Sequence, residues 1–191
     1  DGVAAYRQLG ITLNELARHS EAVQALNRAA SLQPDHGPTY LERARAARGL
    51  GNNPAALYDV EQALRFEPDN AEALLLSSAV KRLMGRREEA LADCERALQL
   101  DPDNWSLHNN RGVLLDELQR QEEALASFER SLALNPDNPD TFLNIGTALV
   151  GLKRGKDALK KYDEVLALDP SDIAALNAKG IIASPNCSTT Q

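Results

Sequence analysis

The sequence has few of the residues that build chemical sites. Its 191 residues include two cysteines, three histidines and only 4% aromatic side chains. Two cysteines, Cys94 and Cys187, cannot form a disulfide framework, and Cys94 is interpreted as a buried structural thiol. The scarcity of aromatic residues argues against a large aromatic-lined ligand pocket. Because the histidines lie at no metal-ligand spacing, we expect no metal, no cofactor and no catalytic activity.

Long apolar runs and clustered basic residues are also lacking. No run approaches the ~20 apolar residues that span a bilayer, and no secretory leader opens the chain. We therefore expect no membrane association and a cytoplasmic location. A net charge of −7, from 28 acidic and 21 basic residues, argues against a nucleic-acid partner. Since the chain begins at Asp1 without a methionine, we expect a fragment of a longer protein.

What the sequence does contain is a repeat of 34 residues. Prolines recur at that period, at Pro34, Pro68, Pro102, Pro136 and Pro170. Alignment on them brings an alanine into every repeat, at Ala22, Ala56, Ala90, Ala124 and Ala158. It also aligns a column of small residues, at Gly10, Ala44, Ser78, Gly112, Gly146 and Gly180. Such a period is typical of stacked repeat proteins.

Each repeat predicts two amphipathic helices. In the fourth, apolar residues recur at helical spacing on either side of a polar gap: Leu107, Leu114, Leu115 and Leu118, then Ala124, Leu125, Phe128 and Leu132. The repeat proline ends the second helix, since it lacks an N–H and clashes with the preceding turn. We expect each small residue to face the alanine of its own repeat, as Gly112 would face Ala124, so that the two helices approach closely.

This pattern resembles the tetratricopeptide (TPR) repeat. The first repeat matches it through Tyr6, Leu9, Gly10, Leu13, Ala22, Leu26, Ala29 and Pro34, and the fifth through Phe142, Ile145, Gly146, Leu149, Ala158, Tyr162 and Pro170. Repeats two to four depart from it with Arg43, Ser77 and Arg111 at an expected leucine, and repeat three also with Lys81.

The resemblance implies an all-α fold, a right-handed α-solenoid of antiparallel helix pairs (a TPR superhelix) with about 11 helices. The array would occupy residues 1–183, with repeats at 3–36, 37–70, 71–104, 105–138 and 139–172 and a terminal helix at 173–183. Residues 184–191 are expected to form a disordered tail.

In the resembled family the first helices of the repeats (helices A) line a concave groove, and the second helices (helices B) form the convex side. The helix A halves carry nine basic and six acidic residues. We expect a groove with a basic N-terminal end, an apolar middle and an amide-lined C-terminal half, suited to a peptide with acidic and apolar residues. Its candidate residues are Arg45, Arg48, Arg82, Leu41, Leu75, Leu76, Asn110 and Asn144.

The main functional hypothesis is a non-catalytic protein–protein interaction module that holds a peptide or protein segment in this groove. One alternative is the substrate-recruiting arm of a larger enzyme such as an O-linked glycosyltransferase, because Asn110 and Asn144 resemble the asparagine ladder of the O-linked N-acetylglucosamine transferase. Another is a structural scaffold that self-associates end to end through Ile181 and Ile182. The plainer interpretation remains that the arginines are a solvated helix face and that Leu75 and Leu76 pack between repeats.

Overall fold

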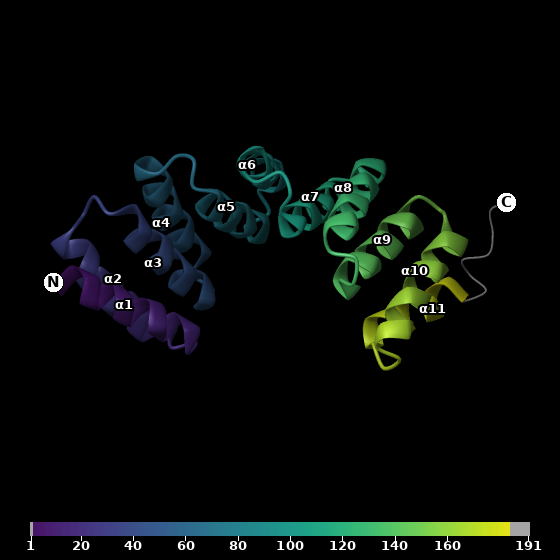
Figure 1. Cartoon of the computed structure of the whole chain (residues 1–191), viewed down its shortest axis with the longest axis horizontal. Coiled ribbons are helices and arrows are strands. Elements are labelled where there is room, and N and C mark those ends of the chain that lie inside the picture. Colours follow the sequence, from purple (N-terminus) through teal and green to yellow (C-terminus); the bar gives the residue numbers. More distant parts are fainter. Residues whose placement is uncertain (1, 184–191) are drawn as a thin grey trace. The chain divides into compact units, whose positions relative to one another are not determined.

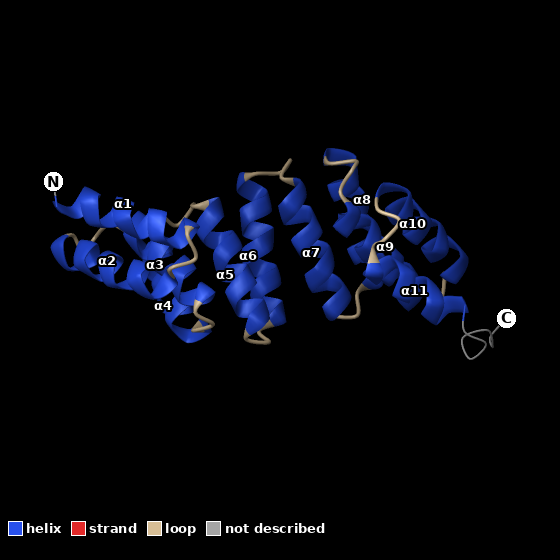
Figure 2. Cartoon of the chain, turned by 90° about the horizontal axis from the view of Figure 1, so that it is seen from below, coloured by secondary structure: helices blue, strands red, loops and turns tan. Residues whose placement is uncertain are grey.

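The computed structural model describes residues 2–183, and this part of the chain is built of helices joined by short turns, without strands (Figures 1 and 2). The all-α prediction and the expected number of helices are confirmed. The helices are α1 (Gly2–Glu15), α2 (His19–Leu32), α3 (Gly37–Gly49), α4 (Asn53–Phe66), α5 (Ala71–Leu83), α6 (Arg87–Leu100), α7 (Trp105–Glu117), α8 (Gln121–Leu134), α9 (Pro139–Gly151), α10 (Gly155–Leu168) and α11 (Ile173–Ala183). The predicted tail lies outside the described residues.

The chain forms two compact units, Asp1–Pro102 and Asp103–Gln191. The first contains α1 to α6 and the second α7 to α11. Within each unit the odd-numbered helices (helices A) up to α9 pack against the helix B that follows each of them, and each helix B packs against the next helix A. Neighbouring helices A also touch directly, α1 against α3, α3 against α5, and α7 against α9. Successive helices A therefore share one side of each unit.

Helices A and helices B begin with different caps. At α9 the side-chain oxygen of Asn138 accepts from the backbone N–H of Thr141 at 3.1 Å, which is typical of an asparagine before a first-turn proline. At α3 the cap is His36, whose ring nitrogen accepts from the N–H of Thr39 at 3.3 Å. Four helices B begin instead with an arginine paired to an acid three residues later: Arg18–Glu21, Arg86–Glu89, Arg120–Glu123 and Arg154–Asp157.

The turn from helix A to helix B repeats one backbone feature. A residue with positive φ, between 56° and 78°, occurs once in each of five repeats, at Ala17, Gly51, Gly85, Gln119 and Lys153. This left-handed conformation ends helix A and reverses the chain. Only glycine adopts it without steric cost, so three of the five turns carry strain that the other two avoid.

The small residue of helix A lies against a large side chain of helix B. A Cβ added to Gly112 would lie 2.4 Å from a ring carbon of Phe128, and one added to Gly146 would lie 2.4 Å from Tyr162. At the glycines the nearest side chain is thus four residues beyond the predicted alanine. In repeat three, however, the hydroxyl of Ser78 donates to the backbone carbonyl of Ala90, its predicted partner, at 2.8 Å. The sizes match along the column: glycines face Leu26, Phe128 and Tyr162, whereas Ala44 and Ser78 precede the smaller Val60 and Cys94 by the same interval.

The polar departures from the repeat pattern find partners across the helix pair. Arg43 donates to both carboxylate oxygens of the buried Asp59, at 2.6 and 2.8 Å. In the next repeat, Ser77 and Lys81 both bond to Asp93, at 2.6 and 2.5 Å. A buried charge is tolerated only when it is paired and hydrogen-bonded. Arg111 of α7 likewise donates to Ser127 of α8 at 2.6 Å. Each polar departure on helix A therefore has a polar partner on the helix B of its own repeat.

Candidate functional site

A hollow of about 450 Å³ opens on the helices A of the first unit. Three successive helices A line it, with one residue from the start of α2. The lining residues are Ile11, Asn14 and Glu15 of α1, His19 of α2, Glu42, Arg45, Arg48 and Gly49 of α3, and Glu72 of α5. This set is called the helix A hollow below. Two of the arginines that the sequence places in a groove, Arg45 and Arg48, lie in it.

Arg45 is tied to carboxylates on two repeats. Its Nη2 bonds to Glu72 of α5, and its Nε lies 3.5 Å from a carboxylate oxygen of Glu42. The same Nε is buried and makes no hydrogen bond with any described residue. Asn14 of α1 donates to the backbone carbonyl of Glu42 at 2.9 Å. The hollow is therefore held across three repeats by polar contacts.

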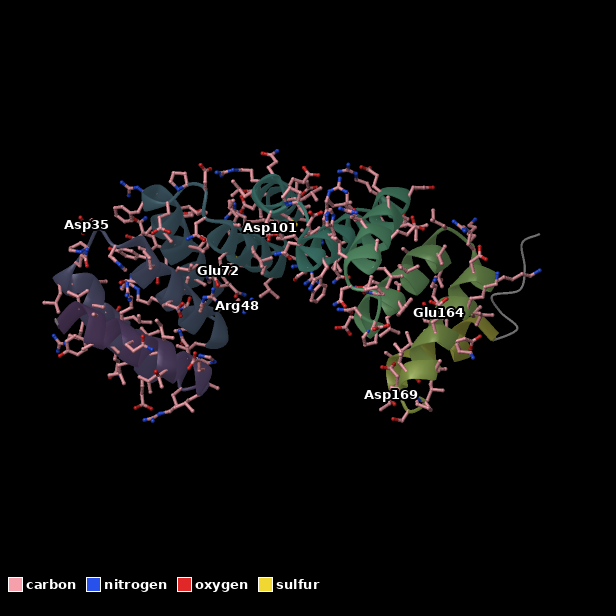
Figure 3. The ribbon with its side chains drawn as sticks, in the orientation of Figure 1. Asp35, Arg48, Glu72, Asp101, Glu164 and Asp169 are labelled. Carbon is pink, nitrogen blue, oxygen red and sulfur yellow. The ribbon has the colours of Figure 1, made fainter. Side chains whose placement is uncertain are left out.

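Arg48 differs from Arg45 in its environment. It is exposed and forms no ion pair with any residue in the described part of the chain. Figure 3 places Arg48 and Glu72 on the same side of the first unit, where both line the hollow. With Glu15 and Glu42 the hollow holds three carboxylates against two guanidinium groups, so this region is mixed in charge. The charge summed over whole helix A halves is positive, and this sum does not reveal that three acidic residues gather in the hollow.

The other candidates of the first unit are distributed between the surface and the core. Arg82 is exposed on α5. Leu41 and Leu76 are only 4% and 6% exposed and belong to one buried cluster with Val60 and Val80. Leu75 is half-buried. Apolar contact with a ligand could therefore come from Leu75, whereas Leu41 and Leu76 support the helices from within.

In the second unit an asparagine pair joins two helices A. Asn144 of α9 donates from Nδ2 to Oδ1 of Asn109 on α7, at 3.1 Å. Thr141 lies 3.4 Å from the same oxygen. The partner of Asn144 is thus Asn109, and the expected ladder residue Asn110 lies beside it, half-buried. The sequence does not distinguish the two adjacent asparagines, because the contact that separates them is with Asn144, 35 residues from Asn109.

The described residues, 2–183, hold no metal cluster and no membrane span. No group of three or more His, Cys, Asp or Glu there could hold a metal ion, and no helix in that range has the length and apolar character to cross a membrane. Cys94 is fully buried, as predicted, and Cys187 lies outside the described residues.

Comparison with known families identifies the repeats. Three sequence models, each described as tetratricopeptide repeat, match residues 3–36, 85–143 and 117–182. The chain belongs to the tetratricopeptide repeat family. A search of curated proteins finds no match.

Solved TPR structures share the fold. The MamA 41-end structure from Desulfovibrio magneticus RS-1 has a TM-score of 0.84 at 18% identity, covering 91% of this chain and 98% of that one. YrrB, described as a TPR protein with an unusual peptide-binding site, has a TM-score of 0.79 at 21% identity, with coverages of 92% and 90%. MamA AMB-1 has a TM-score of 0.74 at 23% identity, covering 92% and 96%. At these identities the likeness shows the fold alone.

Proposed function

We propose that this TPR chain is a non-catalytic interaction module that binds a peptide or protein segment on its helices A. The observation that carries the proposal is the helix A hollow, to which three successive repeats contribute polar side chains. The volume of about 450 Å³ falls within the ~300–1,000 Å³ of ligand sites. YrrB, which has the same fold, is described as having a peptide-binding site.

The groups in the hollow favour an extended segment that carries an acidic residue. The exposed Arg48 supplies a cation that no described acid neutralises. Arg45 is paired with Glu42 and Glu72, so its guanidinium is already engaged within the hollow. A ligand carboxylate would pair with Arg48. The Asn144–Asn109 pair gives the helices A of the second unit an amide surface that suits a peptide backbone.

Charge reversal tests this ligand chemistry. Arg48→Glu should weaken capture of acidic peptides from a random peptide display library by about tenfold or more, since a charge-assisted contact becomes a repulsion. Arg65→Glu is the matched control, because Arg65 is exposed on helix B α4 and its reversal changes net charge equally. Equal weakening by both variants, or by neither, would contradict binding at the hollow. Circular dichroism establishes that both variants stay helical.

A second candidate is self-association through the outer face of α11. Ile173 and Ile181 are largely exposed there, and a Cβ added to Gly180 would meet nothing within 4 Å. Large exposed apolar side chains at helical spacing mark interaction surfaces. Light scattering should then show a mass that rises with concentration, and Ile181→Lys with Ile182→Lys should abolish the rise. A constant monomer mass in the unmodified chain would remove this candidate.

A further inference from the structure

A cluster of basic side chains surrounds the turn between α9 and α10. Residues 153–161 hold five basic residues and one acidic residue, whereas the rest of the chain has a net charge of −11. Four of the five cations are exposed and are called the basic turn below: Lys153, Arg154, Lys156 and Lys160. The chain therefore carries a local positive region on an acidic background.

Two of these four cations have no partner in the described part of the chain. Arg154 and Lys160 both bind Asp157, at 3.0 and 3.4 Å. Their hydrogen bonds lower the pKa of Asp157, which therefore stays ionised and neutralises one positive charge. The ammonium groups of Lys153 and Lys156 form no hydrogen bond or ion pair with any residue between 2 and 183. Four cations against one carboxylate leave the basic turn with a net charge of +3.

The other dense basic cluster of the chain is already engaged. At the α5–α6 turn Lys81 binds Asp93, and Arg86 binds Glu89. The two remaining cations of that cluster also interact within the protein: Arg82 and Arg87. Unpartnered cations gathered at one turn are therefore particular to the fifth repeat.

The fold does not require a cation at the start of α10. Lys156 lies in the first turn of α10, where repeats three and four have Glu88 and Glu122. The helix dipole stabilises an acid in this position and disfavours a cation. A lysine here therefore repels the positive end of its own helix, and an external anion would relieve that repulsion.

The size of the basic turn favours a short acidic segment of protein. At ~1.5 Å per residue, the acids from Asp163 to Asp169 lie roughly 10–20 Å beyond Lys156 along α10. Figure 3 shows two of them, Glu164 and Asp169, on the same unit. A membrane surface or a nucleic-acid duplex presents anions over a wide area and would meet these acids as well. A short run of aspartate or glutamate needs only the basic turn, and lysine ammonium groups pair with carboxylates in many orientations.

We infer that the basic turn is a binding site for an acidic segment of a partner protein. Carboxylates of the segment pair with Lys153 and Lys156, and they share Arg154 and Lys160 with Asp157. The site goes beyond the proposed function, because none of its four cations lines the helix A hollow. The chain thereby has one binding surface on the helices A of its first unit and another at a turn of its second.

The probe is a hexapeptide of glutamate, capped at both ends and titrated into isotopically labelled full-length chain. The chain carries Arg48→Glu, so that the helix A hollow does not contribute to the signal. The expected nuclear magnetic resonance result is a saturable shift of the backbone amide signals of residues 153–160, whereas the capped hexapeptide of glutamine causes none. Raising the ionic strength from about 0.1 to 1 M shortens the Debye length from ~10 to ~3 Å and should weaken binding about tenfold or more. No saturable shift at these residues, or equal shifts with the glutamine peptide, would overturn the proposal.

Repeat four supplies the matched variant. A triple variant installs its residues Gln119, Glu122 and Ala126 at the basic turn: Lys153→Gln, Lys156→Glu and Lys160→Ala. Because a sister repeat folds with these residues, helicity should persist while binding falls at least about tenfold. Lys156→Glu alone should weaken binding in the same direction.

The control changes the net charge equally at exposed helix B positions of the first unit. Arg28→Glu with Arg65→Glu should leave binding at residues 153–160 unchanged. Undiminished binding in the triple variant, or an equal loss in the control, would overturn the proposal. Tighter lysine-dependent binding of a single-stranded DNA hexamer or of phosphatidylserine vesicles than of the glutamate peptide would overturn the assignment to a protein segment.

Discussion

Substituting Gly112 by alanine should destabilise the chain, although alanine is the better helix former. In an exposed helix the change would gain about 1 kcal/mol from helix propensity. Here the new Cβ would lie 2.4 Å from Phe128, against a preferred carbon–carbon separation of ~3.5–4.0 Å. Phe128 is 1% exposed, so its ring is enclosed in the core. Overpacking of this kind costs about 1–3 kcal/mol, so after the propensity gain we expect a net loss of up to about 2 kcal/mol.

A second substitution, which copies repeat two, should restore part of the stability that Gly112→Ala removes. Gly112→Ala with Phe128→Val recreates the pair that Ala44 and Val60 form in repeat two. Phe128→Val alone leaves a cavity opposite Gly112. In the double variant the Cβ of the alanine at position 112 partly fills that cavity. The double variant should therefore be more stable than the sum of the two single losses predicts, by about 0.5–3 kcal/mol of coupling.

Urea unfolding followed by far-ultraviolet circular dichroism measures all three variants against the unmodified chain. A stabilised Gly112→Ala, or a double variant whose loss equals the sum of the single losses within about 0.5 kcal/mol, would refute the reasoning from size complementarity. Substitution of Ala124 by phenylalanine would not discriminate in this way, because Ala124 is fully buried and would be overpacked under either pairing.

Three further predictions concern stability. Gln119→Gly should raise the free energy of unfolding by up to about 1 kcal/mol, since it relieves a left-handed φ of 62°; an unchanged urea midpoint would contradict this. Arg43→Met should cost about 3–5 kcal/mol by leaving Asp59 buried without its partner, whereas Arg43→Leu with Asp59→Ala, which copies the first repeat, should recover most of that loss. Hydrogen bonds from the arginines that begin the helices B lower the pKa of Glu89 and Glu123 below 4.5. Stability from these pairs is complete above the unfolded-state pKa and is lost as pH falls through the lowered folded-state pKa. The thermal midpoint of the unmodified chain should therefore decrease as the solution is acidified through this pH range. A variant that lacks both arginine–acid pairs should show a smaller decrease.

The sequence predicts the helices well because their signals are local. A 34-residue period, helical spacing of apolar residues and terminal prolines all act within one repeat. The small column is also visible in the sequence, but its partner is not, because a helix face does not specify which residue of the next helix lies opposite. The sequence therefore pairs Gly112 with Ala124, while the structure places Phe128 against it.

The charged groups of the candidate site depend on contacts between repeats. Arg45 pairs with Glu72, which is 27 residues away and on the next helix A. Only the pairing with Glu42 has a local signal, since residues three apart on a helix are neighbours. The sequence therefore identifies the arginines of the hollow but not which of them is neutralised.

The central functional claim is that a ligand lies on the helices A. The most direct measurement is hydrogen exchange on the full chain, with and without an acidic peptide selected from a random display library. We expect slower exchange in α1, α3 and α5 around Asn14 and Arg48, and loss of this protection in Arg48→Glu. Protection confined to α2 and α4, or protection that survives Arg48→Glu unchanged, would contradict the claim.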